Sequence, residues 1–182
     1  SGRLREGDFV VSDAGSAFYA VSQELRLGES QRYITSGAMA TMGYSLPAAF
    51  GVAEAVDCRR VFAVTGDGSL HQNIQELGQL AYLRLPVVLV VLDNAGYLSI
   101  RASQKNYFDN RFIGTDERSG LGLPDIAAIG RSYGLPVFEV GNLVQLETAL
   151  DVADAQAGPL VLVVKTPKDQ PIVPTVSSKI DS

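Results

Sequence analysis

The alternation of apolar runs with helix-like stretches predicts a doubly wound α/β fold, in which a mostly parallel sheet carries helices on both faces. The apolar runs are short and rich in Val, Ile and Leu, and they lack the alternation of a half-exposed strand. Strands that are apolar on both faces are typical of parallel sheets covered on two sides. The strands expected on this basis span residues 9–12, 61–65, 87–92, 137–140 and 160–165.

The stretches between these strands have the spacing of amphipathic helices. In the clearest case, Leu70, Ile74 and Leu77 recur at the intervals of one helical face. Pro47, near the start of another stretch, fits the first turn of a helix, where its missing N–H is no loss. The helices expected on this basis span residues 14–27, 46–56, 69–83, 124–133 and 143–155.

Length and composition indicate one domain, residues 1–182, and exclude several classes of function. Apolar residues make up 46% of the chain, which is enough for a sizeable core. The net charge is −5 and no basic run is present, so we expect no binding to nucleic acid. The longest apolar run, residues 86–92, is far too short to span a bilayer, and the N-terminus has no signal-peptide pattern. The lone Cys58 excludes an internal disulfide, and we expect a cytoplasmic protein.

Two segments do not fit the alternating scheme. Residues 36–45 are small and punctuated by glycine, and residues 97–123 are long, polar and poorly periodic. Long irregular segments in compact domains are usually functional or mobile. We therefore expect residues 97–122 to form a mobile loop, and residues 166–182, after the last strand, to form a C-terminal tail.

The sequence Gly66-Asp67-Gly68-Ser69 follows a predicted buried strand and opens a predicted helix. Glycines permit a tight turn and a close approach of the backbone, and the free N–H groups at a helix start favour an anion. Asp67 would repel a phosphate unless a divalent cation lay between the two groups. The alternative interpretation is that Asp67 only caps the helix.

A second polar sequence, Asp93-Asn94-Ala95-Gly96, follows the next predicted strand. Parallel neighbouring strands end at the same edge of a sheet, so Asp67 and Asn94 can face one ion. A carboxylate, an amide oxygen and a backbone carbonyl are hard ligands of the kind that Mg²⁺ prefers. The alternative interpretation is that Asn94 is a turn residue before Gly96.

Together, these two motifs resemble the signature of enzymes that use thiamine diphosphate (ThDP), in which Gly-Asp-Gly is followed, one helix and one strand later, by Asn-Asn. The surrounding sequence, including Thr41-Met42-Gly43-Tyr44, is similar to that of acetolactate synthase and its relatives. The resemblance covers residues 8–165. It implies the ThDP-binding fold and a part in the decarboxylation and carboligation of 2-keto acids.

The resemblance also implies a role for individual residues. Asp67 and Asn94 would bind Mg²⁺ through their side chains, and Gly96 would bind it through its carbonyl. Met42 would act catalytically by holding the cofactor bent, and the carbonyl of Ala40 would accept from the cofactor's amino group. The residues expected to bind the cofactor are Ser16, Ala40, Met42, Gly66, Asp67, Gly68, Ser69, Asn94, Gly96 and Tyr97.

The sequence departs from the pattern of these relatives in several places. Asp93 replaces the first asparagine of the usual pair, which is not the expected metal ligand. Ala40 stands where relatives usually have glycine, and a carbonyl contact tolerates alanine if φ stays negative. The Gln-His pair that acetolactate synthases carry after the first strand is absent, and Tyr-Leu-Ser-Ile-Arg follows Gly96 where they usually read Leu-Gly-Met-Val-Arg. These differences bear on the particular activity and leave the ThDP resemblance intact.

Two residues near the first motif could take part in acid–base chemistry. His71 is the only histidine, and Glu76 lies farther along the same predicted helix. The direction of His71 along the helix is open, and Glu76 is two turns from the strand ends. For His71 we favour a solvated or packing role, and for Glu76 we favour a structural role.

A partner domain follows from the resemblance as well. A pyrimidine-binding domain, in the same gene or a separate subunit, would reach this one from a neighbouring chain of a homo-oligomer. A middle domain that binds FAD is also compatible with the resemblance. Two alternatives remain: a subunit of a split ThDP-dependent decarboxylase of the sulfopyruvate or phosphonopyruvate type, and a non-catalytic phosphate- or nucleotide-binding module. The isolated chain is expected to be inactive.

Overall fold

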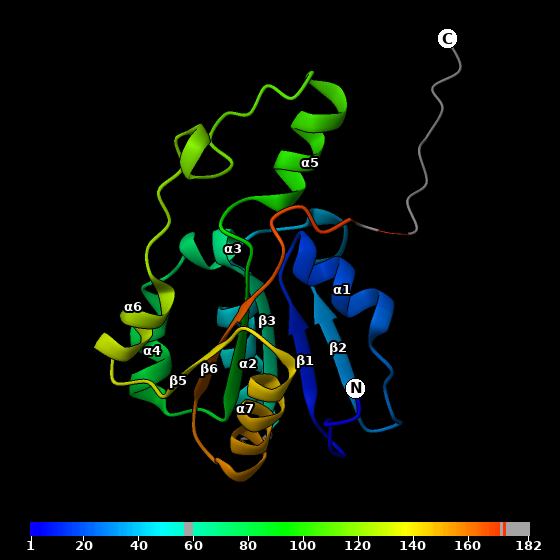
Figure 1. The fold of residues 1–182 in the computed structure, drawn as a ribbon. Coiled ribbons are helices and arrows are strands. Elements are labelled where there is room, and N and C mark those ends of the chain that lie inside the picture. Colours follow the sequence, from blue (N-terminus) through cyan, green and yellow to red (C-terminus); the bar gives the residue numbers. More distant parts are fainter. Residues whose placement is uncertain (57–59, 172, 174–182) are drawn as a thin grey trace.

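Six parallel strands form the centre of the molecule in the computed structural model, which describes residues 1–56, 60–171 and 173 (Figure 1). The strand order is β2-β1-β3-β4-β6-β5, and every neighbouring pair is parallel. The predicted fold class is therefore confirmed. The strands are β1 (Phe9–Ser12), β2 (Arg32–Thr35), β3 (Val61–Gly66), β4 (Val87–Asp93), β5 (Val137–Val140) and β6 (Leu160–Lys165). Cys58 and most of the predicted tail lie outside the described residues.

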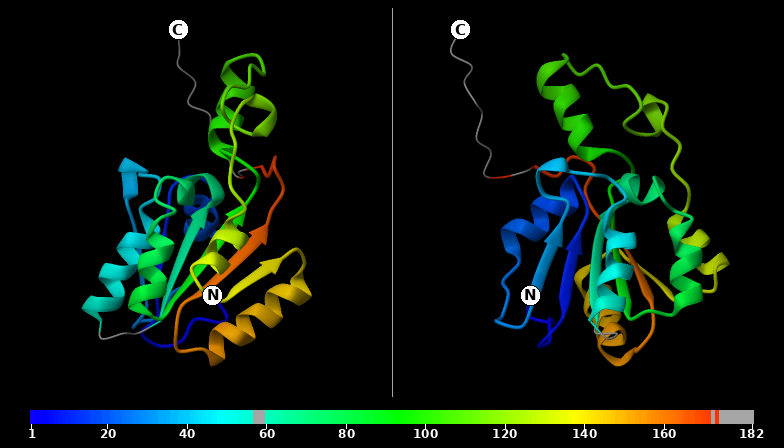
Figure 2. Two further views of the ribbon diagram at one scale, coloured as in Figure 1. Left: turned by 90° about the vertical axis from the view of Figure 1, so that its left-hand side faces the viewer. Right: turned by 180° about the vertical axis from the view of Figure 1, so that it is seen from behind.

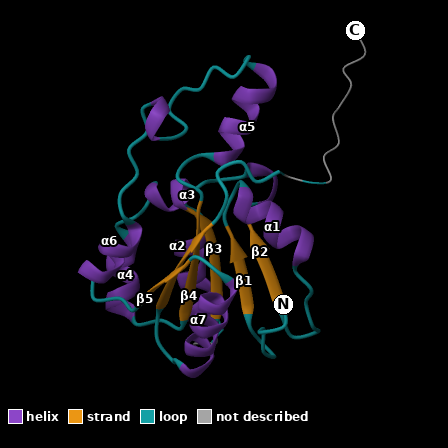
Figure 3. Cartoon of the chain, in the orientation of Figure 1, coloured by secondary structure: helices purple, strands orange, loops and turns teal. Residues whose placement is uncertain are grey.

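Helices cover both faces of this sheet (Figure 3). The α-helices are α1 (Ser16–Glu24), α2 (Ser45–Ala55), α3 (Asp67–His71), α4 (Glu76–Leu83), α5 (Leu98–Tyr107), α6 (Ile126–Ser132) and α7 (Leu143–Ala155), and η1 (Gly37–Met39) and η2 (Glu117–Ser119) are 3₁₀ helices. None of the helices in the described ranges is long and apolar enough to cross a bilayer. On one face α2, α4 and α6 pack against the strands, and on the other face α1 and α7 do so. Each face of the sheet has its own hydrophobic core, and neighbouring residues of one strand pack into different cores, as Val61 and Phe62 do.

The order of the elements opens a crevice between β1 and β3. From β1 the chain runs through α1 to β2 at the sheet edge, and it then returns through α2 to β3 on the other side of β1. Helices α1 and α2 lie on opposite faces of the sheet. Where the winding reverses in this way, the connections diverge at the carboxyl edge and leave room for a ligand. The segments that follow β1, β3 and β4 therefore border one crevice.

The prediction of one continuous helix over residues 69–83 is wrong, because the structure has two helices there. The structure begins the helix earlier, as α3, and separates it from α4 by turns at residues 72–75. In these turns N–H groups bond to carbonyls three residues back, for example from Asn73 to Leu70, as in a tighter 3₁₀ turn. The side chain of Asn73 also donates to the carbonyl of Gly43, a partner outside the helix. The predicted apolar face survives the break, because Leu70, Leu77 and Leu80 are all buried.

Residues 97–123 were expected to be irregular, and this expectation is wrong for the first part of the segment, which forms helix α5. This helix projects beyond the carboxyl edge of the sheet, together with the loop that follows it (Figure 2). Of its ten residues only Leu98 and Arg101 are buried, so it lacks the apolar stripe by which a core helix is recognised. Arg101 donates to the carbonyls of Thr115 and Lys168 and so ties α5 to the loop and to the chain after β6. The mobility expected for residues 97–122 remains a prediction.

Strand β2 was not expected from the sequence. It is an edge strand of four residues, all at least partly exposed, so it lacks the continuous apolar run that identified the others. The start of α1 was expected too early, because Gly15 has a positive φ of 66° and the helix begins only after it. Helix α1 also ends at Glu24, three residues before its predicted end, and the remaining predicted boundaries differ from those observed by at most two residues, which is the usual uncertainty of helix and strand ends.

A buried carboxylate, Asp13, joins the elements that border the crevice. It follows β1 and is 1% exposed. Its Oδ2 accepts from the N–H and hydroxyl of Ser45 at the start of α2 (3.3 and 3.2 Å) and from the hydroxyl of Thr65 in β3 (3.0 Å). Its Oδ1 accepts from the N–H of Ala14 (2.9 Å). One side chain therefore fixes β1, β3 and α2 relative to one another.

Replacing Asp13 by alanine should lower the free energy of unfolding by about 3 kcal/mol, because it leaves several buried donors without an acceptor. Asp125→Ala is the matched control, since Asp125 only caps α6 at the surface by accepting from Ala128, and its loss should cost about 1 kcal/mol. Urea unfolding of both variants measures the difference. Equal losses of unfolding free energy in the two variants would show that Asp13 stabilises the fold no more than a surface helix cap does.

Candidate functional site

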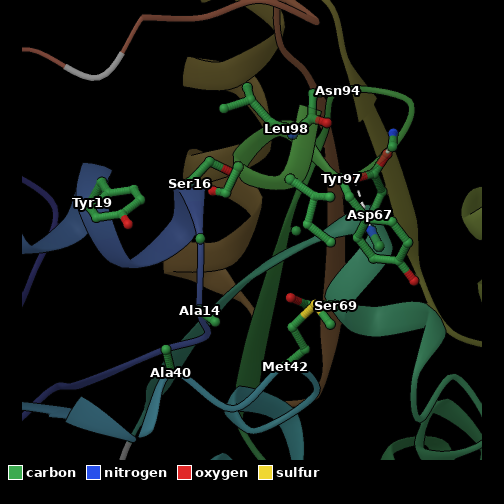
Figure 4. Close-up of a pocket in the computed structure, with 16 residues that line it drawn as sticks. Ala14, Ser16, Tyr19, Ala40, Met42, Asp67, Ser69, Asn94, Tyr97 and Leu98 are labelled. Atoms are coloured by element: carbon green, nitrogen blue, oxygen red, sulfur yellow. Dashed lines mark hydrogen bonds between the residues drawn. The ribbon is translucent and has the colours of Figure 1, made fainter. Parts of the chain in front are cut away.

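A cavity of about 270 Å³ lies at the carboxyl edge of the sheet, where the segments after β1, β3 and β4 meet (Figure 4). All ten residues predicted to bind a cofactor line this cavity. Its walls comprise Ala14, Gly15, Ser16, Tyr19, Ala40, Met42, Gly66, Asp67, Gly68, Ser69, Asn94, Gly96, Tyr97, Leu98, Ser99 and Ile100. The fold thus brings together residues that are more than 80 positions apart in the sequence, from Ala14 to Ile100.

The carboxylate of Asp67 connects two of these segments. Asp67 is 2% exposed. Its Oδ1 accepts from the N–H of Gly68 (2.9 Å), and its Oδ2 accepts from the N–H of Gly96 (2.9 Å), which follows β4. The side chain therefore contacts the first turn of its own helix, whose N-cap is Gly66 and which has no side-chain cap, and it holds the loop after β4 in place.

Burial raises the pKa of Asp67 to about 6, although the N–H groups of Gly96 and Gly68 favour the ionised form. The negative charge of Asp93 raises it further. Asp93 forms an ion pair with Lys165 at the end of β6, and this contact raises the pKa of Lys165. The aspartate that departs from the family pattern is thus paired with a cation, while Asp67 has no ion-pair partner among the described residues.

Asn94 is the second polar side chain at this edge. It is 3% exposed, yet its Oδ1 has no hydrogen-bond partner within the described part of the chain. A buried polar oxygen without a partner is costly, and a water, an ion or a ligand usually satisfies it. An amide oxygen is also a suitable ligand for a hard divalent cation. Asn94 and Asp67 both line the cavity, from the ends of the neighbouring strands β4 and β3.

Two glycines let the backbone pass closely around the site. A Cβ atom at Gly96 would lie 2.0 Å from the carbonyl oxygen of Thr115, and Gly96 has a φ of 148°, so no other residue fits there. A Cβ atom at Gly68 would lie 2.4 Å from the ring of Tyr97. That ring packs over the start of α3, and its hydroxyl accepts from Gln72 (2.8 Å).

The loop after β2 forms the opposite wall of the cavity. Met42 extends from this loop toward Ser69 (Figure 4) and is 41% exposed. The expectation that Ala40 keeps a negative φ is wrong, because its φ is 46° in the left-handed region. The backbone here needs the conformation that suits the glycine of relatives, and an alanine adopts it at a small cost.

Helices α1 and α5 begin at the cavity without a side-chain cap among the described residues. By contrast, α6 and α7 begin elsewhere and are capped by Asp125 and Asn142. The first N–H groups of a helix have no partner within it and carry a partial positive charge. The two uncapped helix starts, together with α3, make the cavity favourable for an anion.

Some lining residues were missed in the sequence analysis. Tyr19 of α1 and Ser99 of α5 both reach the cavity, and Ser99 lies in the segment for which no helix was expected. Only the departure from the family sequence after Gly96 could have drawn attention to it. His71 and Glu76 do not line the cavity, so neither is placed where it could act on a ligand there.

The fold and the site define an α/β domain with a ligand site at the carboxyl ends of parallel strands, built on the Gly66–Ser69 turn and Asn94. Comparison with known families identifies it further. The chain belongs to the family described as "Thiamine pyrophosphate enzyme, C-terminal TPP binding domain", whose model matches residues 13–164. The predicted resemblance to ThDP enzymes is therefore confirmed.

Acetolactate synthases are among the similar proteins. The chain is 32% identical to an acetolactate synthase of Arthrospira platensis over 174 residues, which is 96% of this chain and 30% of that protein. It is 36% identical to the acetolactate synthase isozyme 3 large subunit of Escherichia coli over 153 residues, which is 83% of this chain and 26% of that protein. The chain thus spans less than a third of the length of these relatives.

The pKa of Asp67 predicts how the stability of the metal-free chain depends on pH. Its folded-state pKa of about 6 lies above its ordinary value of 3.8, so the folded state holds this proton more tightly. Proton binding to Asp67 therefore contributes up to ~3 kcal/mol to the free energy of unfolding. This contribution is fully present below pH 3.8 and is lost as the pH rises through 6. Relative to Asp67→Asn, the wild-type chain should therefore lose stability between pH 4 and 7. Chemical unfolding in the presence of a chelator measures this, with the exposed Asp125→Asn as control, and a constant difference would contradict it.

Gly96→Ala should lower the free energy of unfolding by about 2–4 kcal/mol, because the new methyl group meets the backbone of Thr115 and cannot be accommodated by a side-chain movement. Gly122→Ala is the control: it has no atom within 4 Å of the added Cβ and no positive φ. Its effect should stay within about 0.5 kcal/mol. Urea unfolding of the two variants decides, and a similar stability of both would contradict the close approach at Gly96.

Proposed function

We propose that this chain holds the diphosphate of ThDP and a Mg²⁺ ion, as the C-terminal domain of an acetolactate synthase-like enzyme that acts on 2-keto acids. The observation that carries the proposal is the unpartnered, buried Oδ1 of Asn94 beside the buried carboxylate of Asp67. Both residues line one cavity, in the family whose members bind ThDP.

A divalent cation fits this pair of side chains. Asp67 is a buried carboxylate without an ion-pair partner in the described structure, and Asn94 offers an amide oxygen with no donor. A cation would stabilise the ionised form of Asp67 and would supply the missing partner of Asn94. We assign Asp67 and Asn94 as side-chain ligands and the carbonyl of Gly96 as the third protein ligand. Phosphate oxygens and water would complete an octahedral shell of Mg²⁺.

The diphosphate fits the start of the three helices. Gly66, Gly68 and Ser69 form the turn into α3, and Ser16 opens α1 across the cavity. Ser16 and Ser69 make no side-chain hydrogen bond to other described residues, so their hydroxyls are free to donate. The N–H groups of these helix starts and the cation together would offset the charge of the diphosphate.

The wall formed by the loop after β2 suits the remainder of the cofactor. Met42 is flexible enough to pack against an irregular surface, and its side chain enters the cavity. We assign it the role of holding the cofactor in the bent shape that catalysis needs, with the Ala40 carbonyl as acceptor for the amino group and Tyr97 as a further wall. When bound, ThDP supplies the electron sink for loss of carbon dioxide from a 2-keto acid.

A pyrimidine-binding domain of a neighbouring chain would complete the site. Several large apolar side chains are exposed in this chain, including Met39 (81%) beside Ala40 of the cavity wall, and Tyr107 (78%) and Phe108 (62%) at the end of α5. Exposed apolar surface of this kind is typical of regions that another protein surface covers. The proposed assembly is a homo-oligomer. A middle domain that binds FAD is compatible with this proposal, and so are both carboligation and simple decarboxylation.

Asp67→Ala and Asn94→Ala should each weaken Mg²⁺-dependent binding of ThDP by at least about 100-fold, because each removes one ligand of the bridging cation. The measurement is calorimetric titration of ThDP into the enzyme assembled with its partner domain, with and without Mg²⁺. Asp125→Asn, at the surface start of α6, is the matched control and should bind normally.

Circular dichroism must show that both variants remain folded. Wild-type affinity in folded Asp67→Ala and Asn94→Ala would disprove the metal assignment. Equal binding with and without Mg²⁺ in the unaltered enzyme would disprove the role of the cation.

A further inference from the structure

The hydroxyl of Ser99 is a buried polar group that the proposed site has not used. Ser99 is the second residue of α5 and lines the cavity. Its Oγ is inaccessible to solvent and has no hydrogen-bond partner among the residues that the structure describes. Serine in a helix commonly bonds to the carbonyl four residues back, but this Oγ does not. A hydroxyl in such a position costs stability unless a ligand supplies its partner.

The surroundings of Ser99 favour a negatively charged ligand. The Oγ lies 3.3 Å from the position that a Cβ atom at Gly15 would occupy, so it touches the start of α1. Ser99 itself stands in the first turn of α5, and neither helix has a side-chain cap in the described structure. The hydroxyl is therefore located where the starts of two helices meet, and the first N–H groups of a helix have no partner within that helix.

The metal ligands are in the same part of the chain. Asn94 and Gly96 precede Ser99 by five and three residues, and all three line one cavity. A phosphoryl group held in the site proposed above would therefore occupy the cavity that Ser99 also lines. A hydroxyl is a donor that phosphate oxygens accept readily, and a bond to a charged acceptor is stronger than one to a neutral acceptor.

We propose that Ser99 is a further ligand-binding residue, whose Oγ donates a hydrogen bond to the diphosphate of the bound cofactor. This inference rests on the proposed function and extends it to a helix of the protruding segment. Ser99 then couples α5 to the ligand: the hydroxyl is unsatisfied in the free chain and satisfied in the bound one.

The role predicts opposite effects on stability and on binding. In the ligand-free chain, Ser99→Ala removes an unsatisfied buried hydroxyl and places a better helix former in α5, so the melting temperature should stay the same or rise. In the bound chain, the same change removes a hydrogen bond to a charged group and should weaken binding about tenfold or more. If Ser99 were only structural, Ser99→Ala would lower both the melting temperature and the binding affinity, or it would lower neither.

The test is calorimetric titration of the full chain with inorganic diphosphate in the presence and absence of Mg²⁺, combined with thermal unfolding without ligand. Ser99→Ala and Ser99→Cys are the variants, because cysteine keeps the shape of the side chain, with a somewhat larger atom in place of the oxygen, and is only a weak donor. Ser103→Ala is the matched control: Ser103 lies one turn farther along α5, is exposed, and donates to the carbonyl of Ser99. We expect both Ser99 variants to bind Mg²⁺-diphosphate about tenfold more weakly or worse, and Ser103→Ala to bind as the unaltered chain does.

The outcomes separate this inference from the proposed function. Mg²⁺-dependent binding by the unaltered chain, with equal affinity in Ser99→Ala, would overturn the role of Ser99 and leave the proposed function standing. A melting temperature of ligand-free Ser99→Ala several degrees below that of the unaltered chain would show a structural role and overturn the inference as well. Failure of the unaltered chain to bind diphosphate in a Mg²⁺-dependent way would overturn both.

Discussion

The contact between the Asp67 carboxylate and two backbone N–H groups is the interaction on which the site depends. One N–H belongs to Gly68, in the turn after β3, and the other belongs to Gly96, in the loop after β4. This contact is possible only because β3 and β4 are parallel neighbours in register, with Gly66 opposite Leu92. The strand ends therefore lie at the same height, and the residues that follow them are within reach of one side chain.

The buried polar groups at the carboxyl edge of the sheet lower the stability of the ligand-free chain. Asp67 is a buried carboxylate with a raised pKa, and both the Oδ1 of Asn94 and the Oγ of Ser99 are buried without a partner in the described structure. Buried polar groups are usually satisfied within a protein, as Asp13 is by Ser45, Thr65 and Ala14. Asp13 is thus satisfied within the fold, whereas Asn94 and Ser99 each keep a polar atom without a partner in the described structure, and this contrast supports the proposed ligand site.

The protruding segment after β4 contains a helix that local sequence patterns do not predict. Its helix α5 buries Leu98 and Arg101 and leaves the other positions partly or fully exposed, so it has no apolar stripe to be recognised by. Its position depends instead on contacts with distant parts of the chain, such as those of Arg101 with Thr115 and Lys168. Such contacts have no signature in the local sequence, because they depend on where the chain after β6 passes.

The sequence by itself determined that the sheet is parallel and covered on both faces, five of its six strands, and, through the family resemblance, the ten residues that meet at the cavity. The buried strands are recognisable because both faces are covered, and the pairing of Asp67 with Asn94 follows because parallel strands end at one edge. The other site residues, such as Met42 and Ala40, were implied by the resemblance to ThDP enzymes. Tertiary structure alone decided the break between α3 and α4, where Asn73 bonds to Gly43, and the left-handed backbone at Ala40. It also decided that Ser99 faces the cavity. These features depend on contacts between segments far apart in the chain, and such contacts override local preference because burial and hydrogen bonding outweigh the fractions of a kcal/mol that distinguish one local conformation from another.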